Sequence, residues 1–218
     1  MGRKDNSHHI EMKPPILVCS PLVKFPWLKC MTAQDVEFQE NNQAIRPLAA
    51  IVFPSKFPIN DLLKDVCRTL AQQGHDLAGV LQSVSDTKGQ SNKNVSLTSL
   101  RSGWETPVLQ ERGQYASGCR LDPQAITDVA GHLAADLARG ADLLVINRFG
   151  RAESEGYGLR QVLEQAVSSG IPVLLAVRED YVPALEDFAG ELGELLPPDR
   201  KAVLEWSEAV FGAEHELV

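Results

Sequence analysis

The chain has 218 residues, 44% of them hydrophobic, which favours one substantial domain with appendages over two full domains. Its formal net charge of −8 is concentrated at residues 179–218, where eleven acidic and two basic residues give −9, so no clustered basic stripe for binding nucleic acid is indicated. No apolar run approaches the ~20 residues that cross a bilayer, and the N-terminus lacks the order of a secretion signal, so we expect a cytoplasmic protein without membrane insertion.

Residues 1–46 combine several prolines with the polar run 39–43 and show no sustained hydrophobic period. We interpret them as a flexible N-terminal extension. An alternative is that translation starts at Met31, because the first regular element comes only after it. The folded domain is expected over residues 47–218.

The first strand–helix–strand unit is expected over residues 48–81. The continuous apolar run 48–53 predicts a strand that is covered on both faces. Asn60 is expected to cap the following helix, whose apolar stripe ends before Gly74. Residues 77–81 predict the next strand, so the unit is interpreted as a right-handed parallel crossover.

Residues 83–118 interrupt this alternation with polar, turn-rich sequence. Two short alternating segments, 95–101 and 106–111, predict an inserted β-hairpin. The α/β alternation resumes at Asp122, which is predicted to cap a helix that has Pro123 at its first position.

Two further strands and a third helix are expected towards the C-terminus. The apolar runs 141–146 and 172–177 predict the strands, and the apolar stripe over 159–167 predicts the helix between them. The acidic region 185–211 is expected to be helical. Repeated strands separated by amphipathic helices predict an α/β fold, with an open, mainly parallel sheet and helices on both faces.

In such a sheet, ligands bind at the carboxyl ends of the strands. The loop after the first strand, residues 54–60, contains no glycine, whereas a loop that wraps a triphosphate needs glycines so that its backbone N–H groups point inward. Asp61, at the start of the helix, would repel phosphate. We interpret Lys56 as a solvated surface lysine, and the alternative is that it reaches a ligand there.

Asn147 and Arg148 end the strand that, in phosphate-transferring sheets, ends in Asp and often Glu to hold magnesium. Asn147 lacks the charge of an effective hard-metal ligand, and Arg148 reverses that charge. Together with Arg151, and with Arg120 from the adjacent loop, Arg148 would form an anion-binding rim. The alternative is that these are ordinary surface arginines, which are common at the starts of loops.

Glu153 and Glu155 follow closely, and in a purely structural interpretation either one pairs with Arg148 or Arg151. The glycines of this loop provide backbone freedom rather than a dinucleotide fingerprint, because their spacing does not fit that motif. The four cysteines show no C-x-x-C spacing and the histidines stand apart, so no metal site or cofactor is predicted.

Two motifs, Gly-Cys-Arg-Leu-Asp-Pro at 118–123 and Asn-Arg-Phe-Gly-Arg-Ala-Glu at 147–153, resemble those of an uncharacterised bacterial domain of unknown function, and the resemblance covers about residues 47–211. That domain is similar to the archaeal-type nucleoside-triphosphatase family of P-loop proteins. In that family the strand ends in Asp-Glu, followed by an apolar residue, Gly, and a Glu three residues later. Gly150 and Glu153 fit this spacing, whereas Asn147 and Arg148 stand at the Asp-Glu positions.

The resemblance implies a three-layer, P-loop-NTPase-like α/β fold with degenerate nucleotide motifs. Members of the uncharacterised family are often labelled as molybdate-transport or NTPase-like proteins, which implies an oxyanion or metal-cofactor context.

We therefore expect a non-hydrolytic, anion- or nucleotide-binding accessory or regulatory protein that binds a small anionic ligand or a protein partner. Its candidate ligand-binding residues are Arg120, Asn147, Arg148, Gly150, Arg151 and Glu153. One alternative is an active nucleoside triphosphatase, or another phosphate-chemistry enzyme, in which Glu153 or Glu155 acts as base and Arg148 stabilises developing negative charge. A second alternative is a protein-interaction scaffold that acts through the N-terminal extension.

Overall fold

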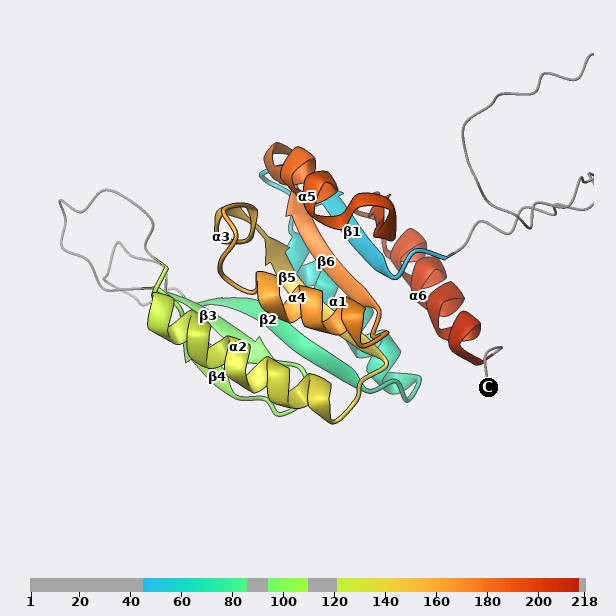
Figure 1. The fold of residues 1–218 in the computed structure, drawn as a ribbon, viewed down its shortest axis with the longest axis horizontal. Coiled ribbons are helices and arrows are strands. Elements are labelled where there is room, and N and C mark those ends of the chain that lie inside the picture. The colour runs from blue at the N-terminus through green and yellow to red at the C-terminus, as the bar shows by residue number, and fades with distance from the viewer. Residues whose placement is uncertain (1–44, 86–93, 110–120, 216–218) are drawn as a thin grey trace, which may run out of the picture. The chain divides into compact units, whose positions relative to one another are not determined.

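The protein is described here from a computed structural model that covers residues 45–85, 94–109 and 121–215. Within these ranges, seven strands form one sheet in the order β4-β3-β2-β5-β6-β1-β7 (Figure 1). Five strands run parallel, namely β1 (Leu48–Phe53), β2 (Leu77–Ser85), β5 (Leu143–Phe149), β6 (Val173–Arg178) and β7 (Gly193–Leu196). The antiparallel strands are β3 (Asn94–Ser99) and β4 (Glu105–Pro107).

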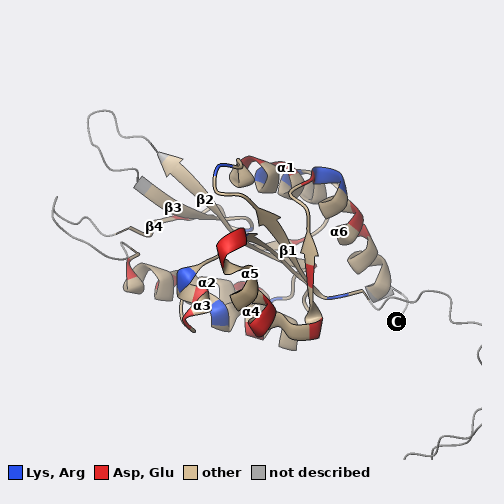
Figure 2. Cartoon of the chain, turned by 90° about the horizontal axis from the view of Figure 1, so that it is seen from above, with Lys and Arg blue, Asp and Glu red and all other residues tan. Residues whose placement is uncertain are grey.

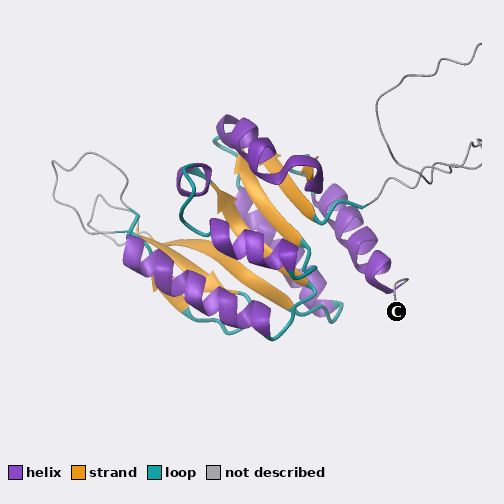
Figure 3. Ribbon diagram, in the orientation of Figure 1, coloured by secondary structure: helices purple, strands orange, loops and turns teal. Residues whose placement is uncertain are grey.

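Helices cover both faces of the sheet, so the predicted three-layer α/β architecture is confirmed (Figure 3). One face carries α1 (Ile59–Gln72) and α6 (Arg200–His215), and the other carries α2 (Pro123–Ala138), α4 (Arg160–Ser168) and α5 (Val182–Ala189). The short helices are α3 (Arg151–Ser154), η1 (Glu179–Tyr181) and η2 (Gly190–Leu192). No helix in the described ranges combines the length and the apolar content that crossing a membrane requires.

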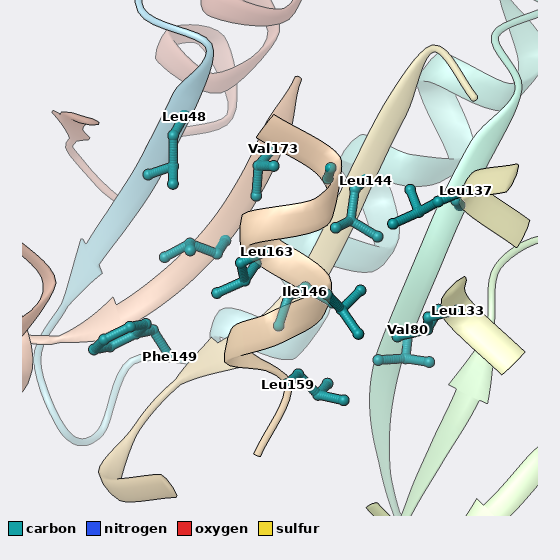
Figure 4. Close-up of a cluster of buried hydrophobic side chains, with 14 of the residues drawn as sticks. Leu48, Val80, Leu133, Leu137, Leu144, Ile146, Phe149, Leu159, Leu163 and Val173 are labelled. Carbon is teal, nitrogen blue, oxygen red and sulfur yellow. The ribbon is translucent and has the colours of Figure 1, made fainter. Parts of the chain in front are cut away.

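The central strands bury side chains on both faces, as their continuous apolar runs predict. Along β1, Leu48 and Ala50 pack with the helices α2, α4 and α5, whereas Ala49 and Ile51 pack beneath α1 and α6. This alternation follows from the two-residue period of a strand. Figure 4 shows the first of these clusters, in which side chains of the sheet meet those of α4.

The two predicted helix starts have different outcomes. Asp122 caps α2 by accepting a hydrogen bond from the N–H of Gln124 at 3.0 Å, as predicted. Asn60 does not cap α1, because the helix begins one residue earlier and Pro58 occupies the cap position without a side-chain hydrogen bond. The Asn60 side chain instead accepts a hydrogen bond from Asn147, so the capping prediction was wrong.

Three further features refine the predicted topology. The strands of the first strand–helix–strand unit, β1 and β2, are parallel but not adjacent, because β6 and β5 lie between them in the sheet. The predicted hairpin is confirmed, and β3 extends the sheet by pairing with β2. Within the acidic region that was expected to be wholly helical, residues 193–196 form β7, which pairs with β1. The predicted N-terminal extension lies outside the described residues, apart from Ile45 and Arg46.

Candidate functional site

The carboxyl ends of the neighbouring strands β5, β6 and β1 lie side by side and form the carboxyl edge of the sheet. Phe53, the last residue of β1, pairs with Arg178, the last residue of β6. On the other side of β6, the pairing register of β5 shifts between Ile146 and Phe149, which is the mark of a bulge. The two strand-end residues that the sequence singled out, Asn147 and Arg148, fall within this irregularity.

Asn147 is a buried hydrogen-bonding centre, with 2% of its surface exposed. Its Oδ1 accepts the backbone N–H of Gln82 at 3.0 Å. Its Nδ2 donates to Asn60 Oδ1 at 3.2 Å and, more weakly, to Gln82 Oε1 at 3.4 Å. The side chain therefore ties β5 to β2 and to α1. A carboxylate could not donate these two bonds, so the amide is matched to its neighbours rather than to a metal ion.

Arg148 is exposed, and its guanidinium carbon lies 5.4 Å from the centroid of the Phe53 ring. The pKa of Arg148 is lowered, first by desolvation of its charge and then by the positive charge of Arg178. Among the described residues, no carboxylate lies within ion-pairing distance of Arg148. The edge of the sheet thus carries a cation that is not neutralised in the described part of the chain.

Arg178 is the second cation of this edge. One of its terminal nitrogens, Nη2, lies 2.6 Å from the Asp180 carboxylate, and its guanidinium lies over the Tyr181 ring at 5.5 Å. Its Nε is buried and has no hydrogen-bond partner among the described residues. A buried donor of this kind is ordinarily satisfied by a protein group, a water molecule or a ligand.

The loop after β1 is closed on itself. The N–H of Phe57 donates to the Pro54 carbonyl at 3.0 Å, the N–H of Ile59 donates to the Phe57 carbonyl at 2.9 Å, and the N–H of Asp61 donates to the Pro58 carbonyl. A phosphate-wrapping loop keeps such N–H groups free for its ligand. The N–H groups of Phe57 and Ile59 are thus used within the loop, and the exposed Lys56 offers the edge a third cation.

A cavity of about 300 Å³ opens beside this edge, between the strands β2 and β3 and the start of α2. Five of the six predicted ligand-binding residues line it, namely Asn147, Arg148, Gly150, Arg151 and Glu153. The sixth, Arg120, lies outside the described residues. The sequence did not reveal the rest of the lining, which is largely apolar. These wall residues are Val80, Val95, Leu97, Val108, Leu109, Leu121, Ile126, Ile146, Ala152 and Leu159, together with Gln82.

The Glu153 side chain holds the loop around α3 in place through hydrogen bonds to the backbone. Its Oε2 accepts the N–H of Gly150 and its Oε1 accepts the N–H of Leu159, each at 3.0 Å, and 8% of the residue is exposed. Gly158 has a φ of +69°, and a Cβ there would lie 2.3 Å from Glu153 Oε1, so the glycine makes room for the carboxylate. Both oxygens of Glu153 are thus occupied by the backbone.

Glu155 makes a hydrogen bond and an ion pair at the surface. It accepts a hydrogen bond from the Tyr157 hydroxyl at 2.6 Å and pairs with Arg151 at 2.7 Å, one turn of helix away. These two contacts lower the pKa of Glu155, which makes it a weaker base. The pairing of Glu155 with Arg151 is the one expected in the purely structural interpretation of this loop. No group of three or more potential metal ligands occurs within the described ranges.

Together, the fold and this edge define an α/β domain with a mainly parallel sheet, in which an amide and two arginines stand at the carboxyl ends of central strands. Residues 48–206 match the family described as "Protein of unknown function (DUF2478)", and the chain belongs to that family.

The chain is also similar to a curated protein, the Molybdenum import ATP-binding protein ModC 2 of Bradyrhizobium diazoefficiens, with 32% identity over 176 residues. The match covers 80% of this chain but 19% of that protein, so the chain spans about a fifth of the length of its relative.

Two solved structures share the fold. One is a human cancer-related nucleoside triphosphatase, with a TM-score of 0.52, 15% identity, and coverage of 78% of this chain and 96% of the other. The second is THEP1 from Aquifex aeolicus, with a TM-score of 0.52, 12% identity, and coverage of 75% and 96%. Identities this low show likeness of fold alone, and they confirm the predicted P-loop-NTPase-like architecture.

Proposed function

We propose that this domain is an accessory protein that binds an anionic ligand at the carboxyl edge of its sheet and does not hydrolyse nucleoside triphosphates. The observation that carries the proposal is that two cations converge on Phe53: the Arg148 guanidinium lies 5.4 Å from the centroid of its ring, and Arg178 is its pairing partner on β6. The pKa of Arg148 is lowered, first by desolvation and then by the positive charge of Arg178. Bringing two cations together costs free energy, and a bound anion offsets that cost. The unpartnered Nε of Arg178 supports the same interpretation.

Two features of this edge support the non-hydrolytic part of the proposal. The loop after β1 contains no glycine and bonds the N–H groups of Phe57 and Ile59 within itself, so those two groups are not free for a triphosphate. At the strand end, Asn147 donates to Asn60 and Gln82 where a magnesium-binding carboxylate would have to accept a metal. Positioned phosphates and a metal ion supply most of the catalysis in this class of reaction, so neither substitution is compatible with efficient turnover.

The accessory role is supported by the relationship to the molybdenum import protein. This chain corresponds to about a fifth of that relative, and so to one segment of a larger protein that is named for ATP binding and molybdenum import. Molybdate is a tetrahedral oxyanion, and arginine pairs well with oxyanions of this kind. Molybdate is therefore one of the anions against which the site should be measured.

Isothermal titration calorimetry tests the proposal. The purified protein is titrated with inorganic phosphate, molybdate and ATP, each with and without Mg²⁺. We expect binding of at least one anion that does not require Mg²⁺, and a loss of about tenfold in affinity for Arg148→Gln.

The matched control is Arg68→Gln, which removes an arginine whose side chain is 66% exposed on α1, and it should leave affinity unchanged. The absence of binding by all three anions, with and without Mg²⁺, would refute the binding proposal. Mg²⁺-dependent release of phosphate from ATP would refute its non-hydrolytic part.

A further inference from the structure

We infer that the ligand of this edge is an organic anion with an apolar body, rather than a bare inorganic oxyanion. This inference rests on the proposed function and specifies the class of ligand. The anionic group would lie at Arg148, and the apolar body would fill the adjoining cavity. Arg148 connects the two places, because it lines the cavity and its guanidinium also lies over Phe53, the pairing partner of Arg178.

The walls of the cavity carry the first part of the argument. Val80, Ile146 and Leu159 come from β2, β5 and the start of α4, and Figure 4 shows their side chains near one another at one end of the buried cluster. Val95 and Leu97 of β3 close the opposite side. Val95 and Leu97 are partly exposed, whereas Val80, Ile146 and Leu159 are buried behind them. Nothing on an inorganic oxyanion could cover the exposed parts of Val95 and Leu97, whereas a hydrocarbon ring would remove them from water.

The size of the cavity narrows the class of occupant. A volume of about 300 Å³ is at the lower end of the range for small-molecule sites. That volume accommodates a ring system and is too small for a peptide helix. The ligand class is therefore a compact aromatic or alicyclic compound that carries one anionic group.

Polar groups at the mouth give the occupant an orientation. The Gln82 carboxamide accepts a weak bond from Asn147, and its own NH₂ group has no partner in the part of the chain that the structure describes. It can donate to an oxygen of the ligand near the anionic group. A cavity with apolar walls and a few polar groups at one end is the usual form of a site for an amphiphilic small molecule.

Phenyl phosphate and inorganic phosphate are the two probes that test this inference, because they share the anionic group and differ by the ring. We expect calorimetry to show that phenyl phosphate binds about tenfold more tightly than inorganic phosphate. Val95→Trp, which fills the cavity from β3, should abolish this preference and leave the affinity for inorganic phosphate unchanged. Val95→Phe is a smaller substitution that serves if the tryptophan variant does not fold.

Leu192→Trp is the matched control, since Leu192 is an exposed apolar residue next to β7, at the other end of the sheet. It should keep the preference for phenyl phosphate. Equal affinity of the wild type for the two probes would overturn this inference and leave the proposed function standing. An unchanged preference in both Val95 variants would also overturn it. If neither probe binds the wild type, the inference fails, and silence of molybdate and ATP as well would remove the proposed function.

Discussion

The guanidinium of Arg148 lies 5.4 Å from the centre of the Phe53 ring, although their strands, β5 and β1, are separated by β6. The irregular pairing of β5 beyond Ile146 permits this reach across the end of β6. A cation over an aromatic face is stabilised by roughly 0.5–1 kcal/mol at an exposed site. The ring therefore fixes a positive charge at the carboxyl ends of β1, β5 and β6.

Asn147→Asp should destabilise the protein without creating a magnesium site. The carboxylate cannot donate to Asn60 and Gln82, so the free energy of unfolding at pH 7 should fall by about 1–3 kcal/mol. The loss should shrink as the pH falls, because the protonated acid has a donor again. Urea unfolding with and without Mg²⁺ measures both effects, and a variant as stable as the wild type that is further stabilised by Mg²⁺ would contradict the prediction.

Glu153→Gln should also cost stability, because the variant keeps only one acceptor oxygen for the N–H groups of Gly150 and Leu159. Leaving one of them unpaired should lower the free energy of unfolding by about 1–3 kcal/mol. Glu164→Gln is the matched control, since Glu164 is half exposed and pairs with Arg160 one turn away, and it should change stability by less than about 0.5 kcal/mol. A Glu153 variant with native stability that loses turnover would instead support the enzymatic alternative.

The parts of the fold that were predictable from sequence are those specified locally. Asp122 and Pro123 together define the start of α2, because a cap residue and a first-turn proline act on the first turn of the helix, which lies next to them in the sequence. The burial of β1 on both faces was likewise evident in its unbroken apolar run. The placement of β1 between β6 and β7 was not evident, since strand order depends on packing between elements that are distant in sequence.

The wrong predictions for Asn60 and for residues 193–196 have the same physical origin, which is contact with segments distant in sequence. Asn60 has the residue type of a helix cap, but its side chain interacts with Asn147, 87 residues further along the chain. Residues 193–196 carry no strong local strand signal, and they become a strand because β1 offers an open edge for pairing. At the candidate site, the strand-end position of Asn147 and Arg148 was predictable, whereas the apolar cavity beside them was not, because its walls come from several elements.

Arg101→Met should unfold the protein at a lower denaturant concentration. Arg101, with 13% of its side chain exposed, donates to both oxygens of Asp76 and to the carbonyls of Asp136 and Gly140 at the end of α2. Its removal should lower the free energy of unfolding by about 2–4 kcal/mol. Arg68→Met removes an exposed arginine and should cost less than about 0.5 kcal/mol. Similar losses in the two variants would show that Arg101 does not join these segments.

Cys67 should resist alkylation in the folded protein. Burial in α1 raises the pKa of its thiol to about 12, and the thiolate is the reactive form. Iodoacetamide at pH 8 should therefore modify Cys67 only after denaturation, as followed by mass spectrometry of its peptide. Because the unfolded chain releases this proton at a lower pH than the folded chain does, the thiol should also reduce stability as the pH rises from about 9 towards 12. Rapid labelling under native conditions would show that α1 opens readily.

Gly79→Ala should be far more damaging than Gly74→Ala, and the pair separates a steric clash from backbone strain. Both glycines have a positive φ, +126° for Gly79 and +99° for Gly74. A Cβ at Gly79 would lie 2.0 Å from the carbonyl oxygen of Val145 on the adjacent strand β5, whereas one at Gly74 would meet nothing within 4 Å.

Gly74→Ala should therefore lower the free energy of unfolding by only about 1–2 kcal/mol, the cost of a left-handed conformation. In Gly79→Ala, the methyl group would in addition push β2 away from β5, so the free energy of unfolding should fall by roughly 3 kcal/mol or more. Thermal and urea unfolding of the two variants provide the comparison. Equal losses would mean that β2 and β5 can move apart at this point without breaking their pairing, and that the close approach of the two backbones does not require glycine.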